Sequence, residues 1–252
     1  MPEADAMTRI WPSFAVLLAL GAPGGVLAEV PDLMQRDPSC EHLATVQYLD
    51  CKVRQVFRCP GFAPYAGPLV REETYLAGAL DSVGLSTVEG NSLAYADAQG
   101  EFSLFSIPDT VEETSFDTFM ATGSGSFLAE GSLKFLGMVK PVTLGAKSSA
   151  EDTSAMIGDV PATEARVEVT LTMPAPVGAF TDYQKGYYLP SLRLFLEGET
   201  TGGPFYKPEK TPHRPMSVAV PGEHGFDVVE SDFCNVKTSR YAPAPAEPGG
   251  LG

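Results

Sequence analysis

The sequence is poor in the residues that most often carry catalysis or metal binding. It holds three histidines (His42, His213 and His224) and a single tryptophan, Trp11. It contains none of the histidine, serine or glycine spacings that are typical of zinc proteases, α/β-hydrolases, dinucleotide-binding proteins, P-loop NTPases or EF-hands. We therefore expect no enzymatic activity, no cofactor and no metal site.

Two weaker combinations of reactive side chains remain. Cys40 and His42 stand two residues apart, but they could form a nucleophile pair only if Cys40 were reduced. Glu72 and Glu73 are adjacent, and adjacent side chains of a strand point to opposite faces of the sheet. The two carboxylates therefore cannot act together as an acid and base.

Basic residues are scarce. The chain has 17 lysines and arginines against 32 aspartates and glutamates, which gives a formal net charge of −15 at pH 7. Nucleic acids and other polyanions are bound chiefly through clustered basic side chains. This charge balance disfavours a nucleic-acid partner and favours an acidic, well-solvated surface.

Long apolar runs are absent, since none approaches the roughly 20 residues that a membrane-spanning helix needs. The N-terminus instead has the pattern of an export signal, with Arg9 followed by apolar residues 14–20 and by small residues at Val26 and Ala28. We expect cleavage near Ala28, which removes Trp11 and places the protein in the periplasm or outside the cell. The product is not expected to be an integral membrane protein.

Four cysteines follow the expected signal. Cys40, Cys51, Cys59 and Cys234 show no CxxC spacing, and an even number of cysteines in an oxidising compartment is typical of disulfides. If residues 51–59 form one strand, Cys51 and Cys59 stand about 26 Å apart, too far to bond. Two pairings remain: Cys40–Cys51 with Cys59–Cys234, or Cys40–Cys59 with Cys51–Cys234. We prefer the first, because a short fold-back from Cys40 reaches Cys51 more readily.

The rest of the chain alternates between apolar and polar residues. The clearest examples are residues 165–173 and 192–197, and residues 51–59 show the same period of two. Further strands are expected at about 69–77, 83–89, 91–97, 101–107, 117–129, 131–137, 140–146, 153–158, 215–220 and 226–238. Turn residues punctuate these segments, for example around Gly90, Gly100 and Gly123.

Many short strands without an amphipathic helix between them predict an all-β fold. We expect a single antiparallel β-barrel or sandwich of about 8–12 strands over residues 29–240, with a short helix possible within residues 31–50. Residues 241–252, nearly all alanine, proline and glycine, are expected to form a disordered tail.

One segment resembles a known family. Residues 131–144, Gly-Ser-Leu-Lys-Phe-Leu-Gly-Met-Val-Lys-Pro-Val-Thr-Leu, resemble the G-x-L-x-(apolar)-x-G-x-x-K-P-V-x-L hairpin of the YceI family. That family consists of exported bacterial lipocalin-like barrels that hold polyisoprenoid chains. The resemblance is confined to these residues, and it implies a hairpin that turns at Gly137 and a barrel that encloses an apolar ligand.

Two functions are compatible with these patterns. In the first, a barrel interior encloses an apolar ligand such as an isoprenoid or acyl lipid. Its expected lining is formed by Leu133, Phe135, Val167, Val169, Leu171, Leu192, Leu194 and Leu196. In the second, the same side chains fill a solid core, and the protein acts through its surface as a non-enzymatic envelope or assembly factor.

Overall fold

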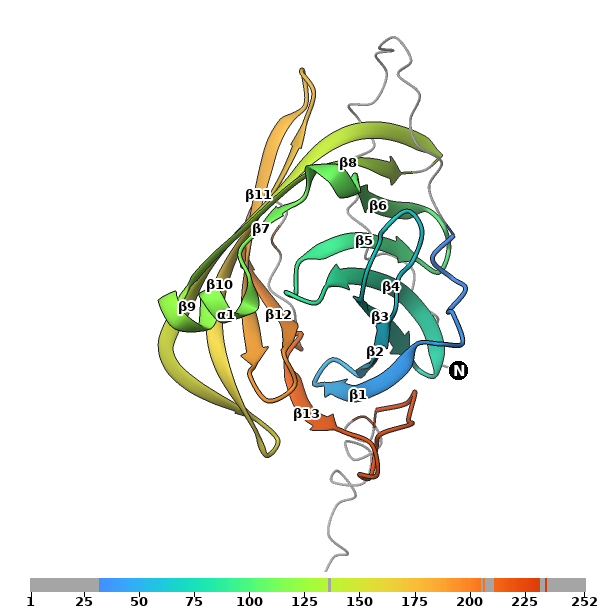
Figure 1. The fold of residues 1–252 in the computed structure, drawn as a ribbon, viewed down its shortest axis with the longest axis vertical. Helices are drawn as coiled ribbons and strands as arrows, with labels where there is room; N and C mark the ends of the chain where they lie inside the picture. Colours follow the sequence, from blue (N-terminus) through green and yellow to red (C-terminus); the bar gives the residue numbers. More distant parts are fainter. Residues whose placement is uncertain (1–31, 136, 205, 207–210, 232–233, 235–252) are drawn as a thin grey trace, which may run out of the picture.

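The chain forms a barrel-shaped antiparallel sheet with one short α-helix (Figure 1). The structure is a computed structural model, and it describes residues 32–135, 137–204, 206, 211–231 and 234. The expected signal at 1–28 and the expected tail at 241–252 lie outside these residues. The prediction of an all-β, antiparallel barrel or sandwich is confirmed, and the structure has the barrel-shaped form.

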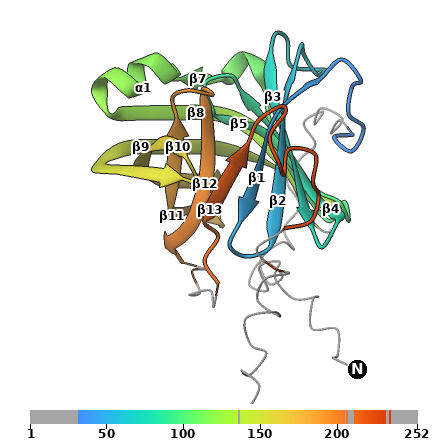
Figure 2. The ribbon, with the colours of Figure 1, turned by 90° about the horizontal axis from the view of Figure 1, so that it is seen from below.

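The sheet follows one continuous strand order. In space this order is β12-β11-β10-β9-β8-β6-β5-β4-β3-β2-β1-β13, with β7 paired to β8. The strands β12 and β13, at the two ends of the order, come beside each other and nearly close the barrel (Figure 2). The strands are β1 (Glu41–Tyr48), β2 (Lys52–Cys59), β3 (Leu69–Leu76), β4 (Ala79–Thr87), β5 (Ser92–Asp97), β6 (Phe102–Ser106), β7 (Glu112–Glu113), β8 (Ser124–Phe135), β9 (Met138–Ile157), β10 (Val160–Met173), β11 (Gly178–Leu189), β12 (Leu194–Gly202) and β13 (Pro215–Ala219).

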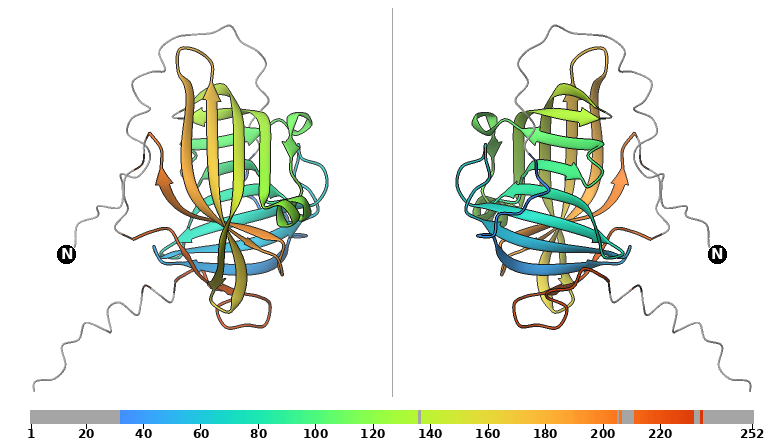
Figure 3. Two further views of the ribbon diagram at one scale, coloured as in Figure 1. Left: turned by 90° about the vertical axis from the view of Figure 1, so that its left-hand side faces the viewer. Right: turned by 90° about the vertical axis from the view of Figure 1, so that its right-hand side faces the viewer.

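Two walls face each other across the interior. The first wall is formed by β1–β6, and the second is formed by the long strands β8–β11 together with β12 (Figure 3). The expected hairpin at residues 131–144 is present, since β8 and β9 pair from Phe135 and Met138 outward. Gly137 has a φ of 80°, a value that a glycine adopts without steric cost.

Apolar side chains pack in clusters along the sheet. One cluster, at one end of the barrel, lies around Phe127, Leu133 and Met173. A second cluster brings Val46 and Val56 of the first wall together with Leu196 of β12. The side chains that line the interior are described below.

The helix α1 (Phe116–Thr122) lies at one end of the barrel, beside β8 and β9 (Figure 2). The strand expected over 117–129 is therefore wrong in its first part, and β8 begins only at Ser124. Ser115 caps the helix by accepting a hydrogen bond from the Thr118 N–H, and Gly123 ends it with a φ of 71°. Local capping therefore overrides the β-propensity of this segment, and the helix buries Phe119 against the barrel.

The N-terminal segment also differs from expectation. The short helix considered within residues 31–50 does not form: residues 33–39 make turns and coil, and β1 begins at Glu41. Pairing with β2 and β13 on its two sides supplies β1 with partners that its own sequence does not reveal. The strand expected at 226–238 is also wrong as far as the structure describes it, because residues 226–231 form turns and bends.

The disulfides are Cys40–Cys59 and Cys51–Cys234. The preferred pairing of Cys40 with Cys51 is therefore wrong, and the second alternative is the one observed. The reason is the β1–β2 hairpin, whose register sets Glu41 opposite Arg58 and so brings Cys40 to Cys59, with 4.2 Å between their Cα atoms. Cys40 and Cys51 lie at opposite ends of β1. Two disulfides are typical of proteins that fold in an oxidising compartment.

Candidate ligand-binding cavity

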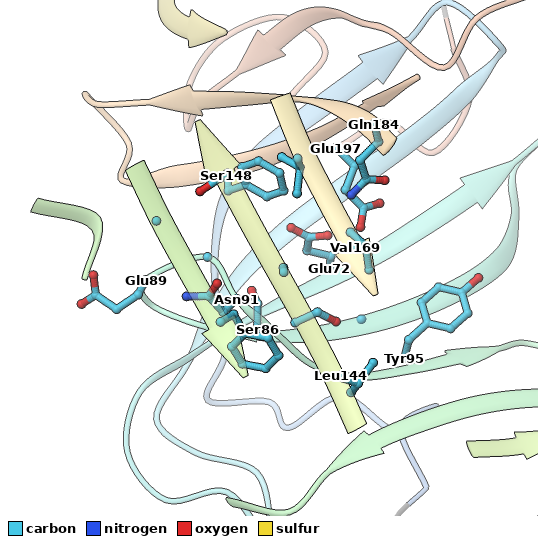
Figure 4. Close-up of a pocket in the computed structure, with 18 of the residues that line it drawn as sticks. Glu72, Ser86, Glu89, Asn91, Tyr95, Leu144, Ser148, Val169, Gln184 and Glu197 are labelled. Carbon is cyan, nitrogen blue, oxygen red and sulfur yellow. The ribbon is translucent and has the colours of Figure 1, made fainter. Parts of the chain in front are cut away.

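A cavity of about 400 Å³ lies inside the barrel (Figure 4). Side chains that point inward from both walls line it, and α1 contributes Phe119. Its apolar part is formed mainly by Phe119, Phe127, Leu144, Val167, Val169, Tyr188 and Phe195, and its polar part mainly by Arg54, Glu72, Tyr95, Asp182, Gln184 and Glu197. The lining is therefore amphipathic, as in many small-molecule sites.

Gly84 helps to open this space. On the inner face of the first wall, the strand register places Gly84 between Glu72 and Tyr95. A Cβ atom at this position would have its nearest neighbours at 3.9 and 4.0 Å, so it would be in ordinary contact and no closer. The missing side chain thus leaves room that the surrounding residues do not fill.

The apolar side of the cavity is largely aromatic. Phe119 of α1 stacks on Tyr188 of β11 with 3.8 Å between ring centroids, and Phe195 of β12 packs on Tyr188 at 4.9 Å. The Tyr188 hydroxyl reaches Ser148 at 3.4 Å. Contacts among these rings hold α1 against the second wall and fix the aromatic surface that the cavity presents.

The polar side of the cavity is organised around Arg54. Its Nη1 donates to Glu72 Oε2 at 2.9 Å, and its Nη2 donates to Glu197 Oε2 at 3.1 Å. Only 7% of the Arg54 side chain is exposed, whereas 49% of the Glu197 side chain is. Because Glu197 lies on the inner face of β12 and lines the cavity, its exposed part faces the cavity (Figure 4).

The two carboxylates around Arg54 differ in pKa. Burial raises the pKa of the Glu72 carboxyl, and Arg54 offsets only part of this effect, while Glu197 adds to it. Burial also acts to raise the pKa of Glu197, but Arg54, His213 and Lys52 together outweigh it, so the pKa of Glu197 lies below its ordinary value. Glu197 is therefore the better ionised of the two at neutral pH.

This difference predicts opposite pH dependences for Glu72→Gln and Glu197→Gln. A carboxyl whose pKa is raised on folding removes stability as the pH rises above about 4.3, whereas one whose pKa is lowered adds stability as the pH rises toward about 4.3 and little more above it. Glu72→Gln should therefore gain stability relative to the parent protein from about pH 4.5 to pH 7.5, and Glu197→Gln should lose stability relative to the parent protein from about pH 3 to pH 4.5. Urea unfolding over both ranges measures both effects, and a change of the opposite sign in either variant would contradict the assignment.

Several polar groups at the cavity have unused bonding capacity. Asp182 and Gln184 project inward from β11, and neither has a hydrogen-bond or ion-pair partner among the residues that the structure describes. Burial raises the pKa of Asp182. Within the same described part of the chain, Arg54 Nε is buried without a partner. These groups are available to a ligand or to water.

Of the eight residues expected to line the interior, the structure brings two to the cavity. Val167 and Val169 line it on β10. Leu133 lies in the apolar cluster at the end of the barrel, and Leu171 packs against that cluster. Phe135 is buried near the β8–β9 turn and does not line the cavity.

The remaining three lie on the other face of β12 or next to it. Leu194 and Leu196 belong to the cluster that includes Val46 and Val56, and Leu192 packs against that cluster. Because β12 is covered on both faces, the alternating residues Phe195 and Glu197 are the ones that reach the cavity. Alternation reveals two faces of a strand but does not identify the one that encloses a space.

The sequence patterns did not predict most of the polar side chains that line the cavity. The pattern around Arg54 did predict a strand, and Arg54 stands in it as a charged residue with buried neighbours on both sides. Glu72 and Glu73 do point to opposite faces, as expected: Glu72 lines the cavity, and Glu73 pairs with Arg71 on the other face. A charged residue inside a well-formed strand was the available signal.

Two of the three histidines, His42 and His213, make contacts within the fold. His42 is stacked between Phe57 and Phe226, with ring centroids at 4.7 and 4.0 Å. His213 Nδ1 lies 3.0 Å from Asp50 Oδ2 and its ring stacks on Tyr48. Across the described residues, no group of three or more histidine, cysteine, aspartate or glutamate side chains is arranged to hold a metal ion.

Comparisons with protein-family models, with curated proteins and with solved structures find no match to this chain. Within the described residues, no helix has the length and apolar character that crossing a membrane requires.

Proposed function

We propose that this protein is exported and that its barrel interior binds a small amphipathic molecule with an acyl or isoprenoid part. The observation that carries this proposal is the cavity, whose volume of about 400 Å³ falls within the range of about 300–1,000 Å³ typical of ligand pockets. A solid core would place packed side chains where the cavity lies. Open space next to Gly84 is therefore the feature that favours a binding protein over a surface-acting envelope factor.

The two sides of the cavity suit two parts of one ligand. Phe119, Tyr188 and Phe195 offer an aromatic surface for an apolar chain. Arg54 and Glu197 offer hydrogen-bonding groups for a polar end. The resemblance of residues 131–144 to the YceI hairpin supports an isoprenoid or acyl chain as the apolar part.

Export rests on independent grounds. The N-terminal pattern that ends at Ala28 is that of a cleaved signal, and Cys40–Cys59 and Cys51–Cys234 are bonds of the kind that form in oxidising compartments. We propose cleavage near Ala28 and a periplasmic or secreted location. An intact mass that begins at Glu29 in protein purified from its host would support this, and a mass that includes Trp11 would contradict it.

Filling the cavity tests the binding proposal. We expect Gly84→Leu to place its side chain in the cavity, because the position is open and its backbone is extended. The neutral fluorescent probe N-phenyl-1-naphthylamine should bind the parent protein with enhanced emission, and Gly84→Leu should weaken its binding at least about tenfold. Stability should not fall, since a glycine weakens a strand and no packed atoms are displaced.

Gly145→Leu is the matched control. The Gly145 backbone borders the cavity, but this residue pairs with the exposed Leu128, and an added Cβ would point to the outer face, where the Leu128 side chain lies 3.9 Å away. This variant adds the same side chain outside the cavity and should leave probe binding unchanged. If the probe does not bind the parent protein, or if Gly84→Leu costs the roughly 1–3 kcal/mol of an overpacked core, the surface-acting envelope factor becomes the better interpretation.

A further inference from the structure

The charges that line the cavity determine which polar end it accepts. Four carboxylates line it, from Glu72, Glu89, Asp182 and Glu197, and Arg54 is the one cation among the described lining residues. They come from β3, from the β4–β5 turn, and from β11 and β12. Figure 4 shows Glu72 and Glu197 close together, whereas the Glu89 side chain points away from them. The electrostatic potential inside should therefore be negative.

Arg54 does not offset this charge for a ligand. Both of its Nη atoms are already bonded to carboxylates, one to Glu72 and the other to Glu197. An anionic head group placed here would meet a guanidinium that is already neutralised, and it would face further carboxylates at short range in a partly desolvated space. A fatty acid carboxylate would thus lose its hydration without gaining a free cation.

A cationic head group would meet the opposite situation. Asp182 has no partner among the described residues, and the cavity-facing part of Glu197 remains open to a second contact. The rings of Phe119, Tyr188 and Phe195 lie in the same cavity, and aromatic faces attract organic cations.

Resting on the proposed function, we infer that the cavity selects cationic amphiphiles, an organic ammonium group joined to an apolar chain, and discriminates against their anionic counterparts. The ammonium group would pair with the carboxylate of Asp182 or of Glu197, in the part of the cavity that the Gln184 side chain lines. The apolar chain would lie against the aromatic side formed with α1. Glu89 contacts the α1 N-terminus through the Phe116 N–H and lies toward the rim.

Competition with three probes of one chain length tests this selectivity. Decylammonium, decanol and decanoate, each below its aggregation limit and at low ionic strength, are titrated against the protein loaded with N-phenyl-1-naphthylamine at about pH 7. We expect the affinity of decylammonium in this competition to be at least about tenfold higher than that of decanoate, with the affinity of decanol between the two. Raising the salt concentration should narrow the difference only partly, because charges within a cavity are screened less than charges at a surface.

Two variants locate the effect. In the double variant Asp182→Asn with Glu197→Gln, decylammonium and decanoate should bind with nearly equal affinity, because the two probes share the same alkyl chain. Glu130→Gln removes one carboxylate from the exposed outer face of β8 and should leave the ratio unchanged. Circular dichroism confirms that each variant is folded before titration.

The outcomes separate this inference from the proposed function. If the probe binds and decanoate displaces it as tightly as decylammonium, the charge selectivity is overturned while the binding function stands. The same holds if the probe binds and Glu130→Gln changes the ratio as much as the double variant does. If the probe itself fails to bind, the proposed function fails, and the inference fails with it.

Discussion

Replacing Cys51 and Cys234 together by serine should lower the free energy of unfolding by about 5 kcal/mol. The Cys51–Cys234 bond closes a loop with a sequence separation of 183 residues, so it restricts nearly the whole unfolded chain. The Cys40–Cys59 bond closes a separation of 19 residues, and its removal by the corresponding double substitution should cost about 3 kcal/mol. Guanidinium unfolding under non-reducing conditions measures both values.

The order of the two losses in unfolding free energy decides this prediction. An equal or larger loss on removing Cys40–Cys59 would show that loop closure is not what sets their contributions. Peptide mapping without reduction gives a direct check of the connectivity, because cleavage after Glu41 and after Lys52 separates Cys40, Cys51 and Cys59. A Cys40–Cys51 crosslink would contradict the β1–β2 register.

Replacing Arg54 by alanine should lower the free energy of unfolding by about 3 kcal/mol, because it leaves two carboxylates in the barrel without their common cation. Glu72 has only 20% of its side chain exposed and would carry most of this penalty. The half-exposed Glu197 can still be hydrated from the cavity, which places the loss at the lower end of the range for broken buried ion pairs. Urea unfolding at about pH 7 measures it.

Arg58→Ala is the control for this substitution. Arg58 is an exposed arginine of the same strand, and its removal should change stability by no more than about 0.5 kcal/mol. Adding Glu72→Gln to Arg54→Ala should recover part of the loss, because the amide needs no countercharge. A loss in Arg54→Ala as small as that in Arg58→Ala would show that water alone solvates these carboxylates adequately.

The architecture was readable from the sequence because it depends on local patterns. A period of two along residues 165–173 and 192–197 reflects strands in which successive side chains point to opposite faces, and this is a property of each strand by itself. The turn at Gly137 needs a positive φ, which is again a local requirement. The helix α1 was not predicted, although its caps, Ser115 and Gly123, are also local features of the sequence.

The disulfide pairing and the cavity were decided by the tertiary structure. Excluding Cys51–Cys59 required only the length of one strand, whereas the choice between the remaining pairings depended on β1 pairing with β2. In the same way, the alternation in β12 could not show that Glu197 rather than Leu196 faces open space, because that depends on how the opposite wall is placed.

The sequence by itself thus determined an antiparallel all-β chain with a hairpin at Gly137 and the exclusion of a Cys51–Cys59 bond. The tertiary structure alone decided that Gly84 leaves a gap and that Arg54, from another strand, meets Glu72 and Glu197 beside it. The physical reason is range: backbone geometry and turn chemistry act over a few residues, whereas a cavity is defined by side chains from strands that are distant along the chain and meet only when the sheet curls into a barrel.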